Sequence, residues 1–172
     1  MKKLQVLLLL VVAGLALAPG AAGAGTTTRV SVSTTEAEAN GASGGSALTF
    51  SGRFVAFTSA ASNLHADDAE TALDVFMRDR SNGTTTLIIR AGGAAGVNAN
   101  GASHGATIDD DGGSISWQSS ATNLDAADVD ATFDIYRRDQ VGANTLLISR
   151  ATGAGGAKGN NISANPDING SG

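Results

Sequence analysis

Two stretches of sequence that lie sixty residues apart decide the fold. Residues 59–79 read SAASNLHADDAETALDVFMRD, and residues 119–139 read SSATNLDAADVDATFDIYRRD. The two stretches align without a gap, and nine of their 21 paired positions are identical. The dipeptide Asn40-Gly41 recurs as Asn100-Gly101, and Asn160 stands at the third place. Self-similarity at a fixed period indicates a repeat architecture, so we expect a tandem array of sixty-residue units.

Each unit is expected to contain four short β-strands. In the first unit they are predicted at residues 46–50, 53–59, 74–79 and 84–90. The second strand places Val55 and Phe57 on one face, and the next unit keeps Ile115 and Trp117 there, as alternation along a strand requires. Asn82-Gly83 predicts a tight turn between the third and fourth strands. Four strands that meander and then lead through a connector into the next unit form one blade of a β-propeller.

The predicted fold class is therefore all-β, with propeller blades of four antiparallel strands. The alternatives are a β-solenoid, whose coils are shorter than these units, and paired sandwich hairpins, which do not ordinarily repeat without gaps. Propellers close with about four to eight blades, whereas this chain holds two and a fraction of a third. We expect an incomplete propeller that is a fragment of a longer gene product; the alternative is an open arc that oligomerises.

The repeated motifs also carry a family resemblance. The order S-x-A-[ST]-N-L, an acidic loop, and then Asp74–Asp79 or Asp134–Asp139 resembles the WD-repeat-like propeller blades of the TolB type. The resemblance covers residues 29–172. It implies a propeller fold and a periplasmic or secreted setting. It implies a function only loosely, because propellers are scaffolds that host many activities.

The repeat register predicts how the chain is divided. The predicted segments are a signal peptide at 1–24, a lead-in strand and linker at 25–44, repeat 1 at 45–104, repeat 2 at 105–164, and the start of a truncated repeat 3 at 165–172.

The first segment is typical of a secretory signal peptide. Lys2 and Lys3 precede an apolar run, and Ala22-Gly23-Ala24 offers small residues for cleavage. The apolar run is shorter than the roughly 20 residues that span a bilayer, so we expect export, cleavage near Ala24, and no membrane insertion afterwards. The location is then periplasmic or extracellular.

Composition narrows the classes of partner and chemistry. The formal charge of −5 becomes more negative once Lys2 and Lys3 are removed, which argues against nucleic acid and against anionic membrane surfaces. The chain has no cysteine, which excludes disulfides, thiol catalysis and thiolate zinc sites. His65 and His104 are not repeated positions, and we interpret both as solvated loop residues.

The loop before the third strand of each unit gathers acidic residues. Asp68 and Asp74 in the first unit correspond to Asp128 and Asp134 in the second. Clustered oxygens suit a hard cation such as calcium, although neither loop matches the EF-hand pattern. The alternative is that Asp74 and Asp134 accept backbone hydrogen bonds and fix the turn into the third strand. Calcium is the one cofactor these four residues suggest, and the structural role is the preferred interpretation.

The repeated pairs Arg78-Asp79 and Arg138-Asp139 suggest ion pairs at a strand end. Such pairs are worth about 0–1 kcal/mol when exposed, so their repetition indicates blade geometry rather than a site. No catalytic motif such as G-x-S-x-G or HExxH is present, and no catalytic or cofactor-binding residue is predicted.

We therefore expect a non-enzymatic, exported propeller module that serves as a binding or scaffold surface for a protein or a cell-surface glycan. One alternative is the non-catalytic propeller part of a larger secreted hydrolase. The other is a calcium-stabilised repeat.

Overall fold

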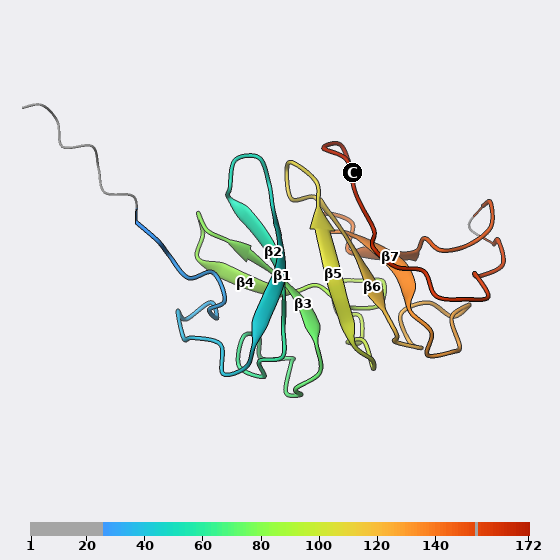
Figure 1. Ribbon diagram of the computed structural model, residues 1–172, viewed down its shortest axis with the longest axis horizontal. Coiled ribbons are helices and arrows are strands. Elements are labelled where there is room, and N and C mark those ends of the chain that lie inside the picture. The colour runs from blue at the N-terminus through green and yellow to red at the C-terminus, as the bar shows by residue number, and fades with distance from the viewer. Residues whose placement is uncertain (1–25, 154) are drawn as a thin grey trace, which may run out of the picture.

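The computed structural model describes residues 26–153 and 155–172; the predicted signal peptide lies outside them. Eight strands form two four-stranded antiparallel sheets that stand side by side (Figure 1). The first sheet has the order β1-β2-β3-β4 and the second has the order β5-β6-β7-β8. The strands are β1 (Ser43–Leu48), β2 (Phe54–Ser59), β3 (Asp74–Asp79), β4 (Thr84–Leu87), β5 (Ser103–Ile108), β6 (Ser114–Ser119), β7 (Asp134–Asp139) and β8 (Asn144–Leu147).

The two sheets are consecutive blades, and the predicted all-β fold of four-stranded blades is confirmed. Every strand of the second blade begins sixty residues after its counterpart in the first. Within the described part of the chain, no helix is long and apolar enough to cross a membrane.

The third strand of each blade lies where it was predicted, and the first strand does not. β1 begins at Ser43 instead of residue 46, because a register shift between Gly44 and Ala47 inserts a bulge into its pairing with β2. Gly45 has a φ of 53°, a left-handed conformation that glycine adopts at little cost. β4 ends at Leu87 because the chain turns there into the following linker, where the Arg90 amide donates to the Ile88 carbonyl.

Aromatic pairs at the centre of each blade form the core. Phe57 on β2 lies opposite Phe76 on β3, with ring centroids 5.7 Å apart. Trp117 on β6 and Tyr136 on β7 repeat this pair at 6.0 Å. All four side chains are at most 2% exposed and belong to one apolar cluster that runs through both blades. The blades therefore share a core rather than forming two separate ones.

The first strand of the second blade provides the contact between the blades. β5 packs against β1, β2 and β3, and the Ser103 amide donates to the Leu73 carbonyl at 2.6 Å. The same contact begins once more on the second blade, where the Ser163 amide donates to the Phe133 carbonyl at 2.7 Å. The C-terminal segment, red in Figure 1, thus starts on the second blade as β5 starts on the first.

Three linkers each fold into a small hairpin. We call residues 29–40 the first linker, 88–100 the second, and 148–153 with 155–160 the third. In the second, the Ala91 amide donates to the Val97 carbonyl and the Ala99 amide to the Ile89 carbonyl, at 2.9 and 2.8 Å. The third linker has both bonds at 2.8 Å, from Ala151 to Ala157 and from Gly159 to Ser149. The first linker has the same pair of bonds in a hairpin two residues shorter, from Ser33 to Ala37 and from Ala39 to Ser31.

The burial of Trp117 predicts that two substitutions of this residue lower the free energy of unfolding by different amounts. The Trp117 indole N–H is buried without a hydrogen-bond partner, so Trp117→Phe removes an unpartnered donor and restores the residue type of Phe57. We expect this change to alter the free energy of unfolding by less than about 1 kcal/mol. Trp117→Ala leaves a cavity and should cost about 3–5 kcal/mol. Denaturant unfolding followed by circular dichroism measures both, and equal losses would contradict this account of the core.

Candidate functional site

The acidic loop of the second blade surrounds a lysine. One oxygen each of Asp128, Asp130 and Asp134 lie within 4.8 Å of one another. The Lys158 ammonium, from the third linker, lies 2.7 Å from Asp134, 3.2 Å from Asp130 and 3.7 Å from Asp128. Asp128 and Asp134 are fully buried, so this ammonium supplies their counter-charge. The position that the sequence offered as an alternative calcium site is therefore occupied by a positive charge of the chain itself.

Two hydroxyl groups complete the arrangement in the second blade. The Tyr136 hydroxyl donates to Asp128, and the Ser149 hydroxyl donates to Asp134 at 2.7 Å. Burial, and then the hydrogen bond to Asp128, raise the pKa of Tyr136 above its ordinary value, so it stays protonated and donating. Both buried carboxylates thus have a hydroxyl donor as well as the lysine.

The first blade keeps the two buried carboxyl groups and lacks all three partners. Asp68 is 4% exposed and Asp74 is 1% exposed. At the positions that correspond to Tyr136, Ser149 and Lys158 stand Phe76, Ile89 and Asn98. None of these carries a hydroxyl or a positive charge, and the Asn98 amide donates instead to the Asp67 carbonyl. One carboxyl oxygen of Asp74 is buried without a hydrogen-bond partner; one of Asp128 is too, but that oxygen lies 3.7 Å from the Lys158 ammonium.

This difference changes the protonation of the first acidic pair. Burial, followed by the neighbouring charges of Asp68 and Glu70, raises the pKa of Asp74 to about 7. Burial also raises the pKa of Asp68. A carboxyl group that is buried beside another without a counter-charge favours its neutral form. The two acidic loops, alike in sequence, therefore differ in charge.

The structure places the four predicted metal-ligand candidates in two separate pairs, one in each blade. The sequence analysis missed Lys158, which follows Asp134 by 24 residues and belongs to a linker. One signal was available, because Lys158 is the only lysine after Lys3.

Arg78 and Asp79 do not pair with each other, because neighbouring side chains on a strand point to opposite faces. The Asp79 carboxylate pairs with Arg53 at 2.7 Å and accepts from the amides of Ser81 and Asn82. The hydrogen bond from Arg53, followed by these amides, lowers the pKa of Asp79 to about 2. Asp139 accepts from Val141 and Gly142 in the same way. Both aspartates shape the turn after the third strand.

The two repeated arginines bind the linker that precedes their own blade. Arg138 is 5% exposed, and its guanidinium donates to the carbonyls of Ala91 at 3.1 Å, Gly93 at 3.1 Å and Arg90 at 3.3 Å. The hydroxyl of Thr145, which lies opposite Arg138 on β8, also donates to the Arg90 carbonyl. Desolvation, and then the nearby Arg90, lower the pKa of Arg138. Arg138 and Thr145 together join the second linker to the second blade through hydrogen bonds.

The first blade repeats this contact one unit earlier. Arg78 donates to the Ser33 carbonyl at 3.0 Å and pairs with Glu36. Thr85, opposite Arg78 on β4, donates to the Val32 carbonyl. The predicted ion pair at the strand end is thus replaced by a bond between successive units.

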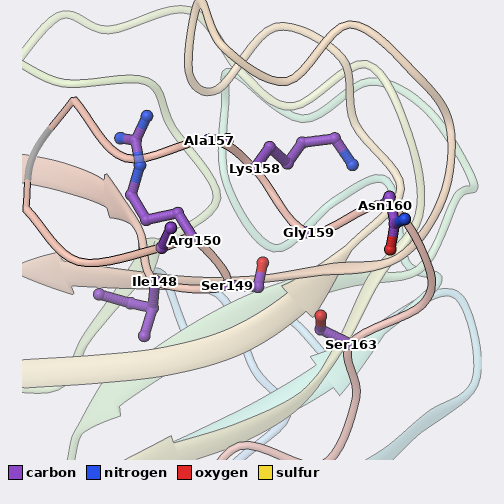
Figure 2. Close-up of a pocket in the computed structure, with 9 residues that line it drawn as sticks. Ile148, Ser149, Arg150, Ala157, Lys158, Gly159, Asn160 and Ser163 are labelled. Carbon is purple, nitrogen blue, oxygen red and sulfur yellow. The ribbon is translucent and has the colours of Figure 1, made fainter.

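The third linker has the surface that corresponds to the one that Arg138 contacts on the second linker, and there it is exposed to solvent. A hollow of about 590 Å³ lies along it, and Figure 2 shows Ile148, Ser149 and Arg150 on one arm of the hairpin and Lys158 and Gly159 on the other. Ile148 is 47% exposed, whereas its counterpart Ile88 is fully buried.

The two histidines have different surroundings, and His65 belongs to the acidic loop of the first blade. His65 is 3.8 Å from the Asp67 carboxylate. The His104 ring bonds to the Gln118 side chain at 2.8 Å and packs edge-on against Phe133. His104 therefore takes part in packing, which differs from the solvated loop residue predicted from the sequence.

Solved structures similar to this chain include two TolB structures. TolB from Acinetobacter baumannii is 15% identical with a TM-score of 0.44, over 77% of this chain and 25% of that one. The putative TolB from Agrobacterium tumefaciens is 18% identical with a TM-score of 0.39, over 61% of this chain and 29% of that one. The chain thus spans less than a third of the length of either structure. TolB is also the type of protein that the repeat motif resembles. No protein-family model and no curated protein matches the sequence.

The two acidic pairs predict opposite effects of the same substitution. Because the folded-state pKa of Asp74 is raised from 3.8 to about 7, the folded state binds its proton more tightly, and this stabilisation is lost as pH rises from about 4 to about 7. Asp74→Asn should therefore raise the free energy of unfolding at pH 8 by about 1 kcal/mol or more. Asp134→Asn breaks a buried ion pair with Lys158 and should lower the free energy of unfolding by about 3–5 kcal/mol.

Denaturant unfolding at pH 5 and pH 8 measures these effects. Asp74→Asn should also reduce the difference in stability between the two pH values. Equal signs for the two variants at pH 8 would show that the acidic loops are equivalent, contrary to the geometry.

Proposed function

We propose that this chain is an exported, non-enzymatic repeat module that serves as a binding or scaffold surface, with a protein as its partner. The observation that carries the proposal is the contrast between the second and third linkers. The second is covered by a blade, while the third presents the same hairpin with an exposed isoleucine. This isoleucine borders the hollow of about 590 Å³ along the third linker, and this concave surface is where we place the partner.

The repeated charged residues support an interaction role over a chemical one. Arg78 and Arg138 bind linker carbonyls, and Asp79 and Asp139 bind turn amides. Lys158 pairs with three aspartates of its own blade. These charged groups stabilise the repeat itself. We therefore propose that the surface recognises its partner through its shape and its exposed backbone groups. A surface glycan is the other class of partner.

A binding experiment tests the proposal. The mature chain, labelled at its N-terminus, is titrated against fractionated exported proteins and against a glycan array. We expect saturable binding to one protein component, with a dissociation constant in the micromolar range or below, that unlabelled chain displaces. Binding only to a glycan would replace the protein partner. Turnover of ester, peptide or glycoside substrates without saturable binding would contradict the proposal and favour the hydrolase alternative.

Calcium binding is a second candidate function, and the asymmetry of the acidic loops restricts it to the first blade. Lys158 already supplies the positive charge at Asp128 and Asp134, whereas Asp68 and Asp74 have no basic partner among the described residues. Asp68 also lines a hollow of about 540 Å³ that gives access from solvent. Carboxylate oxygens are the ligands that calcium prefers.

Isothermal titration of the mature chain with calcium tests this second function. We expect one bound ion per chain, loss of binding in Asn98→Lys, which places a lysine where the second blade has one, and unchanged binding in Asp130→Asn. Calcium binding would be contradicted if titration to millimolar calcium released no heat, or if the Asn98→Lys variant released as much heat as the unmodified chain.

A further inference from the structure

We propose that the hollow between the first and second blades binds a small hydroxylated carboxylic acid, of the size of a sugar acid, whose carboxylate pairs with the buried guanidinium of Arg138. The hollow has a volume of about 380 Å³, within the range of about 300–1,000 Å³ that is typical of small-molecule sites. It shares no lining residue with the hollow along the third linker. The site is therefore separate from the surface on which we place a protein partner.

The two repeated arginines differ in their counter-charge. In the first blade, Nη2 of Arg78 donates to the Glu36 carboxylate of the first linker. In the second blade, Nη2 of Arg138 donates to the Gly93 carbonyl of the second linker at 3.1 Å. Residues 88–100 contain neither Asp nor Glu. Within the described part of the chain, the guanidinium of Arg138 thus meets only neutral acceptors, which are three carbonyls and one hydroxyl.

The charge of Arg138 is buried without an anion beside it. Such a charge is unfavourable, because burial removes the water that would otherwise stabilise it. Desolvation, followed by the like charge of Arg90, lowers the pKa of Arg138, and Asp139 acts in the opposite direction. The Asp139 carboxylate is bound to the amides of Val141 and Gly142 in the turn. A carboxylate bound in the hollow would supply the missing counter-charge.

Other groups that line the hollow favour a single negative charge. The side-chain amide nitrogen of Gln140 is buried without a hydrogen-bond partner, and Gln140 and Arg138 both line the hollow. Arg90 lines it too, but Arg90 already pairs with the Asp67 carboxylate. The hollow thus has one positive charge that lacks an anion. A monoanion balances this charge, whereas a phosphate dianion would exceed it and would be repelled by Asp67.

The remaining lining residues suit a hydroxylated ligand body. The Asp67 carboxylate is half exposed and can accept from ligand hydroxyl groups. His65 accepts from the Asp67 amide through Nδ1 at 3.2 Å, so the proton of its neutral ring is on Nε2 and is available to donate. Thr86, exposed on β4, adds a hydroxyl group. Donors and acceptors of this kind are typical of sites that fix the orientation of a polar small molecule.

Isothermal titration of the mature chain at neutral pH tests the site. The probe is D-glucuronate, and the control is D-glucose, which has a hydroxymethyl group in place of the carboxylate. We expect one bound glucuronate per chain, with a dissociation constant in the millimolar range or below, and no saturable binding of glucose. Glucuronate should also raise the temperature of thermal unfolding, because a ligand that binds only the folded state stabilises it.

Substitutions on the second linker show whether the carboxylate binds beside Arg138. Ala94 is exposed and lines the hollow, so Ala94→Glu places a carboxylate near Arg138 as Glu36 is placed near Arg78. We expect Ala94→Glu to weaken glucuronate binding by about tenfold or more and to raise the unfolding temperature by about 2–4 °C. Ala94→Gln, which has the same size without the charge, should have a smaller effect on both.

Ala95→Glu is the control for net charge. Ala95 is exposed and lies outside the lining of the hollow, so a carboxylate there remains in solvent. Exposed charges contribute little, and we expect the affinity for glucuronate to change by less than about twofold.

Four outcomes would overturn the proposal. Glucose that binds as tightly as glucuronate would show that the carboxylate is not recognised, and inorganic phosphate that binds more tightly would replace the monoanion by a dianion. Glucuronate binding that Ala94→Glu leaves unchanged, or that Ala94→Gln weakens equally, would show that the acid does not pair with Arg138. The last is the absence of saturable glucuronate binding by a chain whose circular dichroism shows that it is folded.

Discussion

The hydrogen bonds from a buried guanidinium to the carbonyls of the preceding linker are the contact on which the rest of the structure depends. Arg138 is almost fully buried, and its pKa is lowered by desolvation, so its charge must be compensated by the groups around it. The acceptors that its Nη atoms meet are the linker carbonyls and the Thr145 hydroxyl. A buried charge is tolerated only where its donors are satisfied. The linker is therefore a structural part of the next blade.

This contact explains why the blades do not behave as independent units. Each blade contains an arginine whose acceptors belong to the unit before it, and each unit ends in a hairpin whose acceptors suit the unit after it. In repeat proteins, stability is approximately a sum of terms within units and terms between neighbours. Here the term between neighbours includes a desolvated charge, so a blade without its linker would leave that charge uncompensated.

The sequence predicted the repeat, the four strands of each unit and the bounds of β3 and β7, because identical residues at a fixed spacing need identical surroundings. It misplaced β1, because the bulge at Gly44 and Gly45 depends on pairing with β2 rather than on local preference. It identified Asp68, Asp74, Asp128 and Asp134 as a repeated set, yet treated the two loops as equivalent. Their difference lies in Phe76, Ile89 and Asn98, which are unremarkable residues until the fold brings them next to the carboxyl groups.

The measurement that tests the central claim most directly is the stability of Arg138→Met. This change keeps much of the apolar stem of the side chain and removes every donor to the second linker. We predict a loss of about 1–3 kcal/mol in the free energy of unfolding, together with faster hydrogen exchange at residues 88–99, whereas Arg80→Met, at an exposed position, should change stability by less than about 0.5 kcal/mol. Equal stability and equal exchange in the two variants would show that the linkers are held by apolar packing alone, and would contradict the account.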